Sequence, residues 1–392
     1  MIFQALDDKK HCVGIYADSQ IHHTLPDNLT HTWSYAGFLA DMDIEYASLY
    51  CEGKTMEQVV PEQLKPEWDK ISGKMKAFLK AFTTAKINLR DVCFYDMIPV
   101  ATLLEWCEIK SKICHYIFEN YEKPANYDFL VGITKLSEQI KHQKLNIDLS
   151  PLKSTLASYR SRAFLKKLNH SPDYINYNIF GTVTGRLSTY SDSFPIMTMD
   201  KKYRKIIKPH NDWLVELDYN AAELRTFLAL NGKDQPQEDL HDWNTKNLFK
   251  EGDRDEAKIR LFSWLYNPKS KDYLLDGEYD RKALLHDCYD DQHVVTPYGR
   301  TIRAVPRNAL NYLIQSTTSD LFLRQVIKIN EILKDTGSFV SWTLHDSVMI
   351  DLRDEEKPLL PQIIDVLGDT RFGKYVVNVS AGNNYGEMKK IK

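Results

Sequence analysis

Two aspartates stand where predicted β-strands end, a place from which carboxylates can reach a shared cation. Asp218 follows the apolar run 213–217, and Asp346 lies between residues 339–344 and 348–352, which pattern as two strands joined by a tight turn. If these strands are neighbours in one sheet, the carboxylates face each other and cations must neutralise their repulsion. Such a pair favours two Mg²⁺ ions, with Mn²⁺ able to substitute, and in-line phosphoryl transfer. Taken singly, each aspartate is equally typical of a turn cap.

A second group of residues recurs every four positions and therefore forms one stripe along a predicted helix. Its members are Arg254, Lys258, Phe262 and Tyr266. Two cations suit the phosphates of a nucleoside triphosphate, and two aromatic rings suit its sugar and base. An ordinary amphipathic helix shows the same periodicity, so the stripe by itself leaves both interpretations open.

Positive charge is concentrated in residues 153–208, where eleven Lys and Arg stand against three Asp, although the whole chain carries a formal net charge of −3. Aromatic residues are interleaved with these cations: Tyr159, Tyr174, Tyr177, Phe180 and Tyr190. Cations that follow a phosphate backbone and rings that pack on bases or sugars are typical of nucleic-acid grooves. A solvated basic face is the alternative interpretation.

The elements that would position these residues change in character along the chain. A length of 392 residues predicts two or three packed subdomains, and 27% charged with 43% hydrophobic residues is typical of a soluble globular protein. The first 50 residues pattern as short strands of a small α/β unit, and residues 61–153 pattern as amphipathic helices. Beyond residue 176, short apolar strands and a long helix at 307–334 predict an α+β sheet domain.

The six cysteines form no Cys-x-x-Cys pair, which argues against a disulfide framework or a zinc module and favours a reducing compartment. The N-terminus lacks the pattern of a signal peptide, and no run approaches about 20 apolar residues. We therefore expect a cytoplasmic protein, in a bacterium or an infected host cell, with no membrane partner.

Over residues 176–391 the sequence resembles family A DNA polymerases, the group that includes bacterial DNA polymerase I and its phage relatives, because several motifs occur in the family's order. They are Thr184-Gly-Arg-Leu-Ser188, Asp218-Tyr-Asn-Ala-Ala-Glu-Leu-Arg225, Asp239-Leu-His241, the stripe from Arg254 to Tyr266, Thr296-Pro-Tyr-Gly-Arg300, the set Arg307, Asn311 and Gln315, and His345-Asp346.

The resemblance implies a right-hand polymerase fold, with a palm built on an antiparallel sheet and with helical fingers and thumb. Residues 91–175 would form the thumb, 176–240 and 305–392 the palm, and 241–304 reduced fingers. The small α/β unit at 1–90 could be an inactive remnant of a 3′-5′ exonuclease. Asp43-Ile-Glu45 has the spacing of part of such a site, but we find no convincing set of further acids around it.

The resemblance also implies the function of a DNA-directed DNA polymerase, a nucleotidyltransferase that adds dNTPs to a primer 3′-hydroxyl on a DNA template. Its metal ligands would be Asp218, Asp346 and the backbone carbonyl of Tyr219, and Lys258 would protonate the departing pyrophosphate. The dNTP would contact Arg254, Lys258, Phe262, Tyr266, His241 and Glu223. Primer and template would contact Arg186, Arg307, Asn311, Gln315 and His345.

Ser347 departs from the family pattern, in which Glu usually follows the second aspartate, and His345-Asp346-Ser347 is also what single-subunit phage-type RNA polymerases carry. A primase or RNA-polymerase-like enzyme, or a catalytically weak nucleic-acid-binding protein, is therefore the alternative. Glu223 favours DNA, since it would exclude a ribose 2′-hydroxyl. The small size suggests a viral or mobile-element origin, and a helicase or processivity factor could act with the chain in DNA replication.

Overall fold

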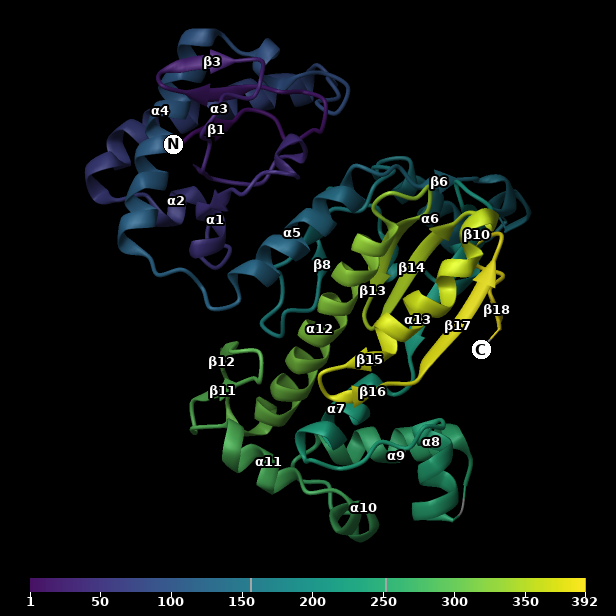
Figure 1. Cartoon of the computed structure of the whole chain (residues 1–392). Helices are drawn as coiled ribbons and strands as arrows, with labels where there is room; N and C mark the ends of the chain where they lie inside the picture. The colour runs from purple at the N-terminus through teal and green to yellow at the C-terminus, as the bar shows by residue number, and fades with distance from the viewer. Residues whose placement is uncertain (156, 251, 392) are drawn as a thin grey trace. The chain divides into compact units, whose positions relative to one another are not determined.

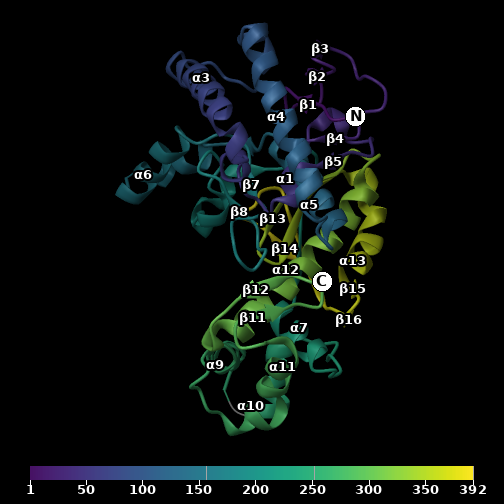
Figure 2. The same cartoon turned by 90° about the vertical axis from the view of Figure 1, so that its left-hand side faces the viewer.

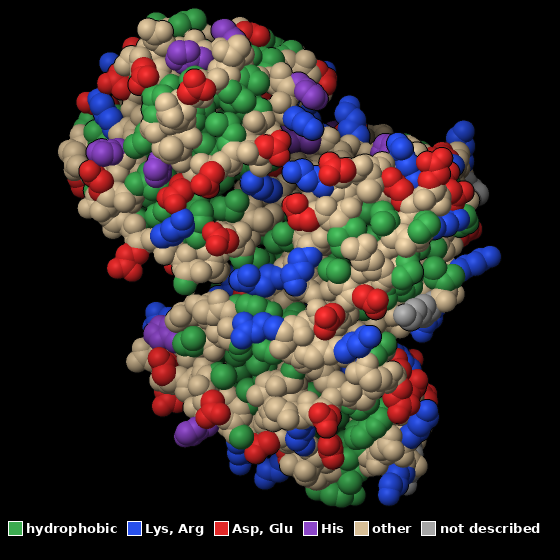
Figure 3. Space-filling model, in the orientation of Figure 1, with side chains coloured by type: hydrophobic (Ala, Val, Ile, Leu, Met, Phe, Trp, Pro, Cys, Tyr) green, Lys and Arg blue, Asp and Glu red, His purple; other side chains and the backbone are tan. Residues whose placement is uncertain are grey.

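The computed structural model describes residues 1–155, 157–250 and 252–391. The chain divides into two compact units, Met1–His142 and Gln143–Lys392, coloured purple to blue and teal to yellow (Figure 1). The expected α+β class is confirmed, because helices pack on antiparallel strands in the larger unit. On the face shown in Figure 3, acidic and basic side chains are intermingled, in keeping with the small net charge.

The first unit combines short strands with long amphipathic helices. Its strands are β1 (Gln4–Ala5), β2 (Ile15–Ala17), β3 (Gln20–His22), β4 (His31–Thr32) and β5 (Glu45–Tyr46), where β1 to β3 form an antiparallel sheet and β4 pairs with β5 in parallel. Its helices are α1 (Ala47–Tyr50), α2 (Met56–Val59), α3 (Lys65–Thr84), α4 (Val100–Asn120) and α5 (Tyr127–Lys141). The core between α3 and α4 buries Met75, Phe82, Leu103 and Cys107.

The boundary of this unit differs from the one expected near residue 90. The helix α4 packs along α3 and also contacts α1, and α5 contacts α1 as well, so both helices belong to the first unit. The range 91–175, expected as one thumb, is therefore divided after His142. Helical periodicity showed that these helices have an apolar face, but it could not show which neighbour that face would cover.

Two cysteines that the sequence analysis left unpaired come together in the first unit. Cys12 and Cys93 form a disulfide, with Cα atoms 5.8 Å apart, across a separation of 81 residues. Cys51, Cys107, Cys114 and Cys288 are free. The expectation of unpaired cysteines is therefore wrong for one pair, because only the tertiary fold brings these two positions together.

The second unit is built on a five-stranded antiparallel sheet of order β13-β14-β10-β17-β18. Its strands are β10 (Trp213–Tyr219), β13 (Phe339–Leu344), β14 (Ser347–Leu352), β17 (Val377–Gly382) and β18 (Lys389–Lys390). The helices next along the chain to these strands are α7 (Ala222–Leu230), α12 (Pro306–Leu333) and α13 (Leu360–Gly368), of which α7 packs against α12. The long helix α12 packs against β13, α13 packs against β17, and the two helices contact each other (Figure 1).

A helical segment lies at one end of this unit, at the bottom of Figure 2. It contains α8 (Leu240–Trp243), a π-helical turn (Asn244–Phe249), α9 (Arg254–Tyr266), α10 (Tyr273–Glu278), α11 (Arg281–Cys288) and the hairpin β11 (His293–Val295) and β12 (Thr301–Arg303). Its core includes Leu261, Trp264 and Tyr279 and is continuous with buried residues of α7 and α12. The segment before the sheet contains β6 (Asn146–Ile147), α6 (Tyr159–Leu168), β7 (Tyr177–Asn178), β8 (Ser188–Thr189) and β9 (Ile207–Lys208). After α13, the short strands β15 (Asp369–Thr370) and β16 (Gly373–Lys374) pair with each other.

Candidate active site

Asp218 and Asp346 meet at one edge of the five-stranded sheet. Strand β10 pairs with β14 in a register that places Asp218 opposite Ser347, the neighbour of Asp346. His345 and Asp346 form the two-residue turn between β13 and β14, and His345 takes the left-handed conformation that such a turn uses (φ 58°). The backbone amide of Tyr219 points to the carbonyl oxygen of Asp346 at 3.4 Å. The prediction that the two strands are neighbours is therefore confirmed.

The electrostatics of this edge favour a bound cation. Burial raises the pKa of Asp218 to about 7, and the charges of Asp346 and Glu216 act in the same direction. The pKa of Asp346 is also raised, first by burial and then by Glu223. The ionised form of both carboxylates would thus be stabilised by a positive charge beside them, and their oxygen atoms are the ligand type that Mg²⁺ and Mn²⁺ prefer. The residues fit a divalent cation site.

Ser347 stands beside a carboxylate that the sequence analysis missed. Its hydroxyl donates to the carbonyl of Leu344 at 3.0 Å and lies 3.5 Å from Oε1 of Glu216. Glu216 precedes Asp218 by two residues on β10, so both side chains leave the same face of the sheet. Burial raises the pKa of Glu216. The alternation of Glu216 and Asp218 along a strand was the signal that could have revealed it.

A cavity of about 330 Å³ opens beside Asp346. It is lined by Arg186, Glu223, Phe262, Thr318, Ser319, Phe322, His345 and Asp346. Five of these residues were singled out in the sequence for nucleotide, primer-template or metal contacts, and they come from four separate segments of the chain. The fold thus gathers them around one space that adjoins the aspartate pair.

Glu223 connects helix α9 to the loop that carries Arg186. It lies in the first turn of α7, where one carboxylate oxygen accepts a hydrogen bond from Arg186 and the other accepts one from the hydroxyl of Tyr266. The rings of Phe262 and Tyr266 are stacked, with centroids 5.9 Å apart and an interplanar angle of 16°. The carboxylate is held on both sides, so its position relative to the cavity is fixed.

The loop that carries Arg186 packs against Arg300, the last residue of the Thr296-Pro-Tyr-Gly-Arg300 motif, and is bound by Ser319 of α12. Gly185 has a φ of +73°, and a Cβ atom there would lie 2.6 Å from the guanidinium of Arg300, so only glycine fits. The hydroxyl of Ser319 donates to the carbonyl of Gly185 at 3.0 Å. Arg300 in turn forms a buried ion pair with Asp320 at 2.7 Å. Sequence motifs that are more than 100 residues apart thus support one loop.

Tyr177, on the strand before this loop, is bound to the edge strand β13. Its hydroxyl donates to the carbonyl of Thr343 at 2.7 Å and accepts a hydrogen bond from the amide of the same residue at 3.0 Å. Tyr177 was predicted as a surface for nucleic acid, but its side chain is buried and both polar contacts are used inside the protein. Its role is therefore to anchor the loop on the sheet.

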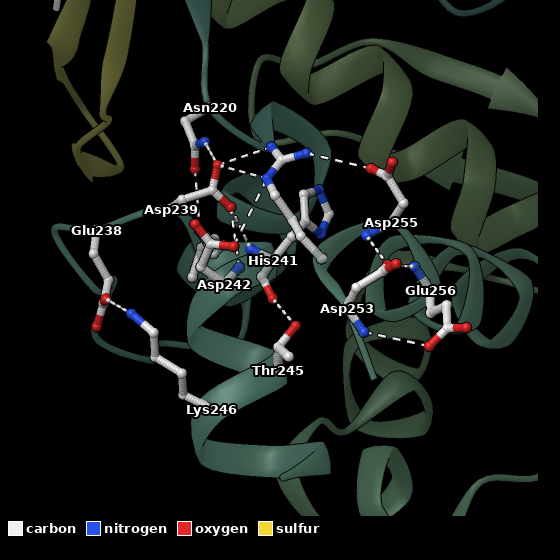
Figure 4. Close-up of polar contacts among 12 residues, drawn as sticks. Asn220, Glu238, Asp239, His241, Asp242, Thr245, Lys246, Asp253, Asp255 and Glu256 are labelled. Carbon is white, nitrogen blue, oxygen red and sulfur yellow. Dashed lines mark hydrogen bonds and ion pairs between the residues drawn. The ribbon is translucent and has the colours of Figure 1, made fainter. Parts of the chain in front are cut away.

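The candidate triphosphate residues lie around α8 and the start of α9 (Figure 4). Arg254 is the first residue of α9 and pairs with Asp239 at 2.8 Å, while Lys258, one turn later, is exposed. His241 is 3% exposed, its Nδ1 has no hydrogen-bond partner among the described residues, and its ring centroid lies 5.9 Å from that of Phe262. Burial lowers the pKa of His241 to about 4, so its ring is neutral at physiological pH.

The remaining predicted residues lie outside the cavity lining. Arg307, Asn311 and Gln315 follow one another at four-residue steps along the start of α12, and Oδ1 of Asn311 is buried with no hydrogen-bond partner among the described residues. The side chain of Tyr219 is buried, with its hydroxyl donating to the carbonyl of Leu367 at 2.6 Å. Only the backbone of Tyr219 could therefore serve a cation.

The first unit offers no comparable site. Glu45 pairs with Lys123 at 2.6 Å and accepts a hydrogen bond from Tyr50, so it is occupied by structural contacts. Within the described ranges, Asp8, Glu138 and His142 are the one group of three potential metal ligands that lie within 4.8 Å of one another. The ammonium of Lys141 bridges Asp8 and Glu138 at 2.6 and 3.0 Å and already neutralises them. No helix within these ranges is long and apolar enough to span a bilayer.

Comparisons with known proteins agree with the motifs. No protein-family model matches the chain. The chain is 25% identical over 311 residues to a DNA polymerase I of Chloroflexus aurantiacus, a match that covers 62% of this chain and only 33% of that protein. Its fold matches the POL domain of Pol1 from M. smegmatis, solved with DNA primer-template and dNTP, with a TM-score of 0.65 at 13% identity over 98% of this chain and 95% of that one. The predicted polymerase fold and the resemblance to family A DNA polymerases are thereby confirmed.

Proposed function

We propose that the chain is a DNA-directed DNA polymerase that adds dNTPs to a primer 3′-hydroxyl. The observation that carries this proposal is the meeting of Asp218 and Asp346 at the sheet edge, beside a cavity that Glu223 and Phe262 line. The similarity to a DNA polymerase I supports it. The chain spans only about a third of the length of that relative.

The proposed chemistry assigns a distinct task to each group around the cavity. Asp218 and Asp346, with the backbone carbonyl of Tyr219, would hold two Mg²⁺ ions, which when bound lower the pKa of the primer hydroxyl and stabilise the departing pyrophosphate. Lys258 would donate a proton to the pyrophosphate from the exposed face of α9. Manganese can replace magnesium at such oxygen ligands.

The incoming nucleotide would be held by side chains from both α8 and α9. Arg254 and His241 would bind the triphosphate, and Phe262 would cover the sugar. Tyr266, whose ring stacks on the ring of Phe262, would lie near the templating base. Glu223, held by Arg186 and Tyr266, would exclude a ribose 2′-hydroxyl, because a carboxylate fixed on both sides would not move aside for the additional oxygen atom. This restriction favours dNTPs over NTPs.

Primer and template would be held by cations and amides on several segments. The candidate contacts are Arg186, Arg307, Asn311, Gln315 and His345. The basic helix α6, which carries Arg160, Arg162, Lys166 and Lys167, would grip the phosphate backbone as part of a thumb. Residues 176–240 and 305–392 would form the palm, and 241–304 the fingers.

The finer biological role is also part of the proposal. We expect the chain to act in DNA replication in the cytoplasm of a bacterium or an infected cell, with a helicase or processivity factor as a further partner. The bacterial relative supports a bacterial setting. The 1–90 segment would serve as a scaffold rather than as a nuclease, because Glu45 is engaged in structural contacts.

A primase or RNA-polymerase-like activity is the second candidate, and Ser347 beside Asp346 is the observation that favours it. Primer extension with separate dNTP and NTP pools in Mg²⁺ and Mn²⁺ distinguishes the two activities. We expect incorporation of dNTPs, and preferential use of NTPs would contradict the assignment of Glu223. Binding of duplex with no incorporation under either metal would instead identify a catalytically weak binding protein.

The metal site itself is tested with Asp218→Asn and Asp346→Asn. Each variant should lose primer extension while retaining duplex binding, measured by fluorescence anisotropy, because neither aspartate is proposed to contact duplex. Asp335→Asn makes the same charge change at an exposed position just beyond α12 and should behave as the unchanged protein. Extension by either active-site variant at the wild-type rate would refute the two-aspartate site.

A further inference from the structure

Asp239 occupies the centre of the polar network drawn in Figure 4. One carboxylate oxygen caps α8 by accepting the amides of His241 at 2.9 Å and Asp242 at 3.1 Å. The other accepts the side-chain amide of Asn220 at 2.6 Å and the guanidinium of Arg254, from Nη2 at 2.8 Å and from Nε at 3.2 Å. A single carboxylate thus receives five hydrogen bonds from three different segments.

The strand that bears Asp218 is connected to this carboxylate through Asn220. The backbone amide of Asn220 donates to the carbonyl of Val376, and the side-chain oxygen of Asn220 accepts a hydrogen bond from the amide of Leu240 at 3.1 Å. The fully buried Arg225 donates to the backbone carbonyl of Asn220 at 2.8 Å and also to the carbonyl of Glu238 at 2.8 Å. The residue just beyond β10 and the residue just before Asp239 are therefore held by the same guanidinium.

The other acidic neighbours of Arg254 are weaker partners. Its Nε lies 4.0 Å from Asp242 and its Nη1 lies 3.7 Å from Asp255, whose side chain is 85% exposed. Among the acidic partners in the described part of the chain, Asp239 alone engages two nitrogen atoms of the guanidinium, and its own position is fixed by other hydrogen bonds. The Arg254 side chain remains 44% exposed, so a ligand can reach it from solvent.

We propose that Asp239 is a positioning residue, which fixes the Arg254 guanidinium for the nucleotide triphosphate and ties helix α9 to the strand that carries Asp218. This inference rests on the proposed polymerase function. The route runs from Asp218 along the backbone to Asn220, two residues later, and from there through direct hydrogen bonds to Asp239 and Arg254. An arginine held in place before the ligand arrives loses less conformational entropy on binding, so Asp239 acts on nucleotide affinity through Arg254.

The first test is Asp239→Asn, measured by single-nucleotide incorporation over a range of dNTP concentrations. Asparagine can still cap α8 with its oxygen, but it presents an NH₂ group to the guanidinium and removes the charge. We expect KM for dNTP to rise roughly tenfold or more while kcat changes by less than about threefold. Asp255→Asn, the matched control on α9, should change KM by less than about twofold.

A double-mutant cycle separates positioning from general support of the fold. In an Arg254→Ala background, Asp239→Asn should change KM by less than about twofold, because the residue through which Asp239 acts is gone. An unchanged or lowered KM in Asp239→Asn, or an equal rise in both backgrounds, would overturn the proposal.

A measurement without nucleotide distinguishes failure of this inference from failure of the polymerase assignment. If the unchanged protein incorporates neither dNTPs nor NTPs, the proposed function fails. The link between Asp239 and Arg254 is then still tested by urea unfolding of the wild type, the two single variants and the double variant. If the shift of the urea midpoint in the double variant differs from the sum of the shifts in the two single variants, the positioning contact is supported. If the shifts add, the contact is overturned.

Discussion

Replacing Ser347 by Glu should destabilise the protein, even though glutamate is the residue that family A DNA polymerases usually carry there. The hydroxyl oxygen of Ser347 lies 3.5 Å from Oε1 of Glu216, and Ser347 itself is only 7% exposed. A carboxylate at position 347 would face the carboxylate of Glu216 across roughly 4 Å. At an effective dielectric constant of about 20, two such charges repel each other by about 4 kcal/mol.

The size of the effect should depend on pH and on divalent cations. At pH 8 without metal we expect Ser347→Glu to lower the free energy of unfolding by about 2–4 kcal/mol. Burial raises the pKa of Glu216, and a second carboxylate would raise it further. The loss of unfolding free energy is therefore fully present only at pH values above the pKa of Glu216 in the folded protein. The loss of stability should diminish as the pH falls through the raised pKa of this carboxylate pair, because one of the two is then protonated, and Mg²⁺ should also reduce the loss.

Urea unfolding followed by tryptophan fluorescence measures this loss. Ser347→Gln introduces a side chain of nearly the same volume as glutamate but without its charge, so it isolates the steric cost. Glu216→Gln combined with Ser347→Glu removes one of the two charges and should recover most of the stability. If Ser347→Glu is as stable as Ser347→Gln at pH 8, or if the second substitution recovers nothing, the repulsion between positions 216 and 347 is not real.

Three further predictions address the cation site, the nucleotide site and the loop support. Because burial raises the pKa of Asp218 to about 7, protons compete with the cation below that pH, so Mn²⁺ affinity measured by calorimetry should fall by up to about tenfold per pH unit below 7 and level off above it. Glu223→Ala should reduce discrimination against NTPs by about tenfold or more in single-nucleotide incorporation, and unchanged discrimination would contradict its role. Asp320→Asn leaves Arg300 without its buried partner and should cost about 2–4 kcal/mol of unfolding free energy, whereas Asp69→Asn, in an exposed pair, should cost less than about 0.5 kcal/mol.

Elements whose determinants are local could be predicted closely from the sequence. Helix α9 spans Arg254–Tyr266, the range expected from the four-residue stripe, because Asp253 caps it and Glu256 completes a capping box. The β13 and β14 hairpin was expected from two apolar runs around a tight turn, and the long helix α12 from its apolar spacing. In each case the residues that decide the structure are neighbours in sequence.

Features that depend on long-range packing could not be predicted. The apolar faces of α4 and α5 were recognised, but their burial against α1 and α3, which moves the unit boundary to His142, follows from tertiary contacts. The Cys12–Cys93 disulfide has the same origin. Asp239 was quoted within a motif and given no role, because its link to Asn220 exists only once β10 and α8 are adjacent.

The contact between Tyr177 and β13 has a consequence for self-association. Strand β13 lies at the edge of the sheet, where unpaired amides and carbonyls invite a strand of a second molecule. The Tyr177 hydroxyl satisfies both the amide and the carbonyl of Thr343 and therefore acts as a single-atom substitute for a neighbouring strand. One phenol thus both fastens a loop to the sheet and closes part of an edge that could otherwise nucleate aggregation.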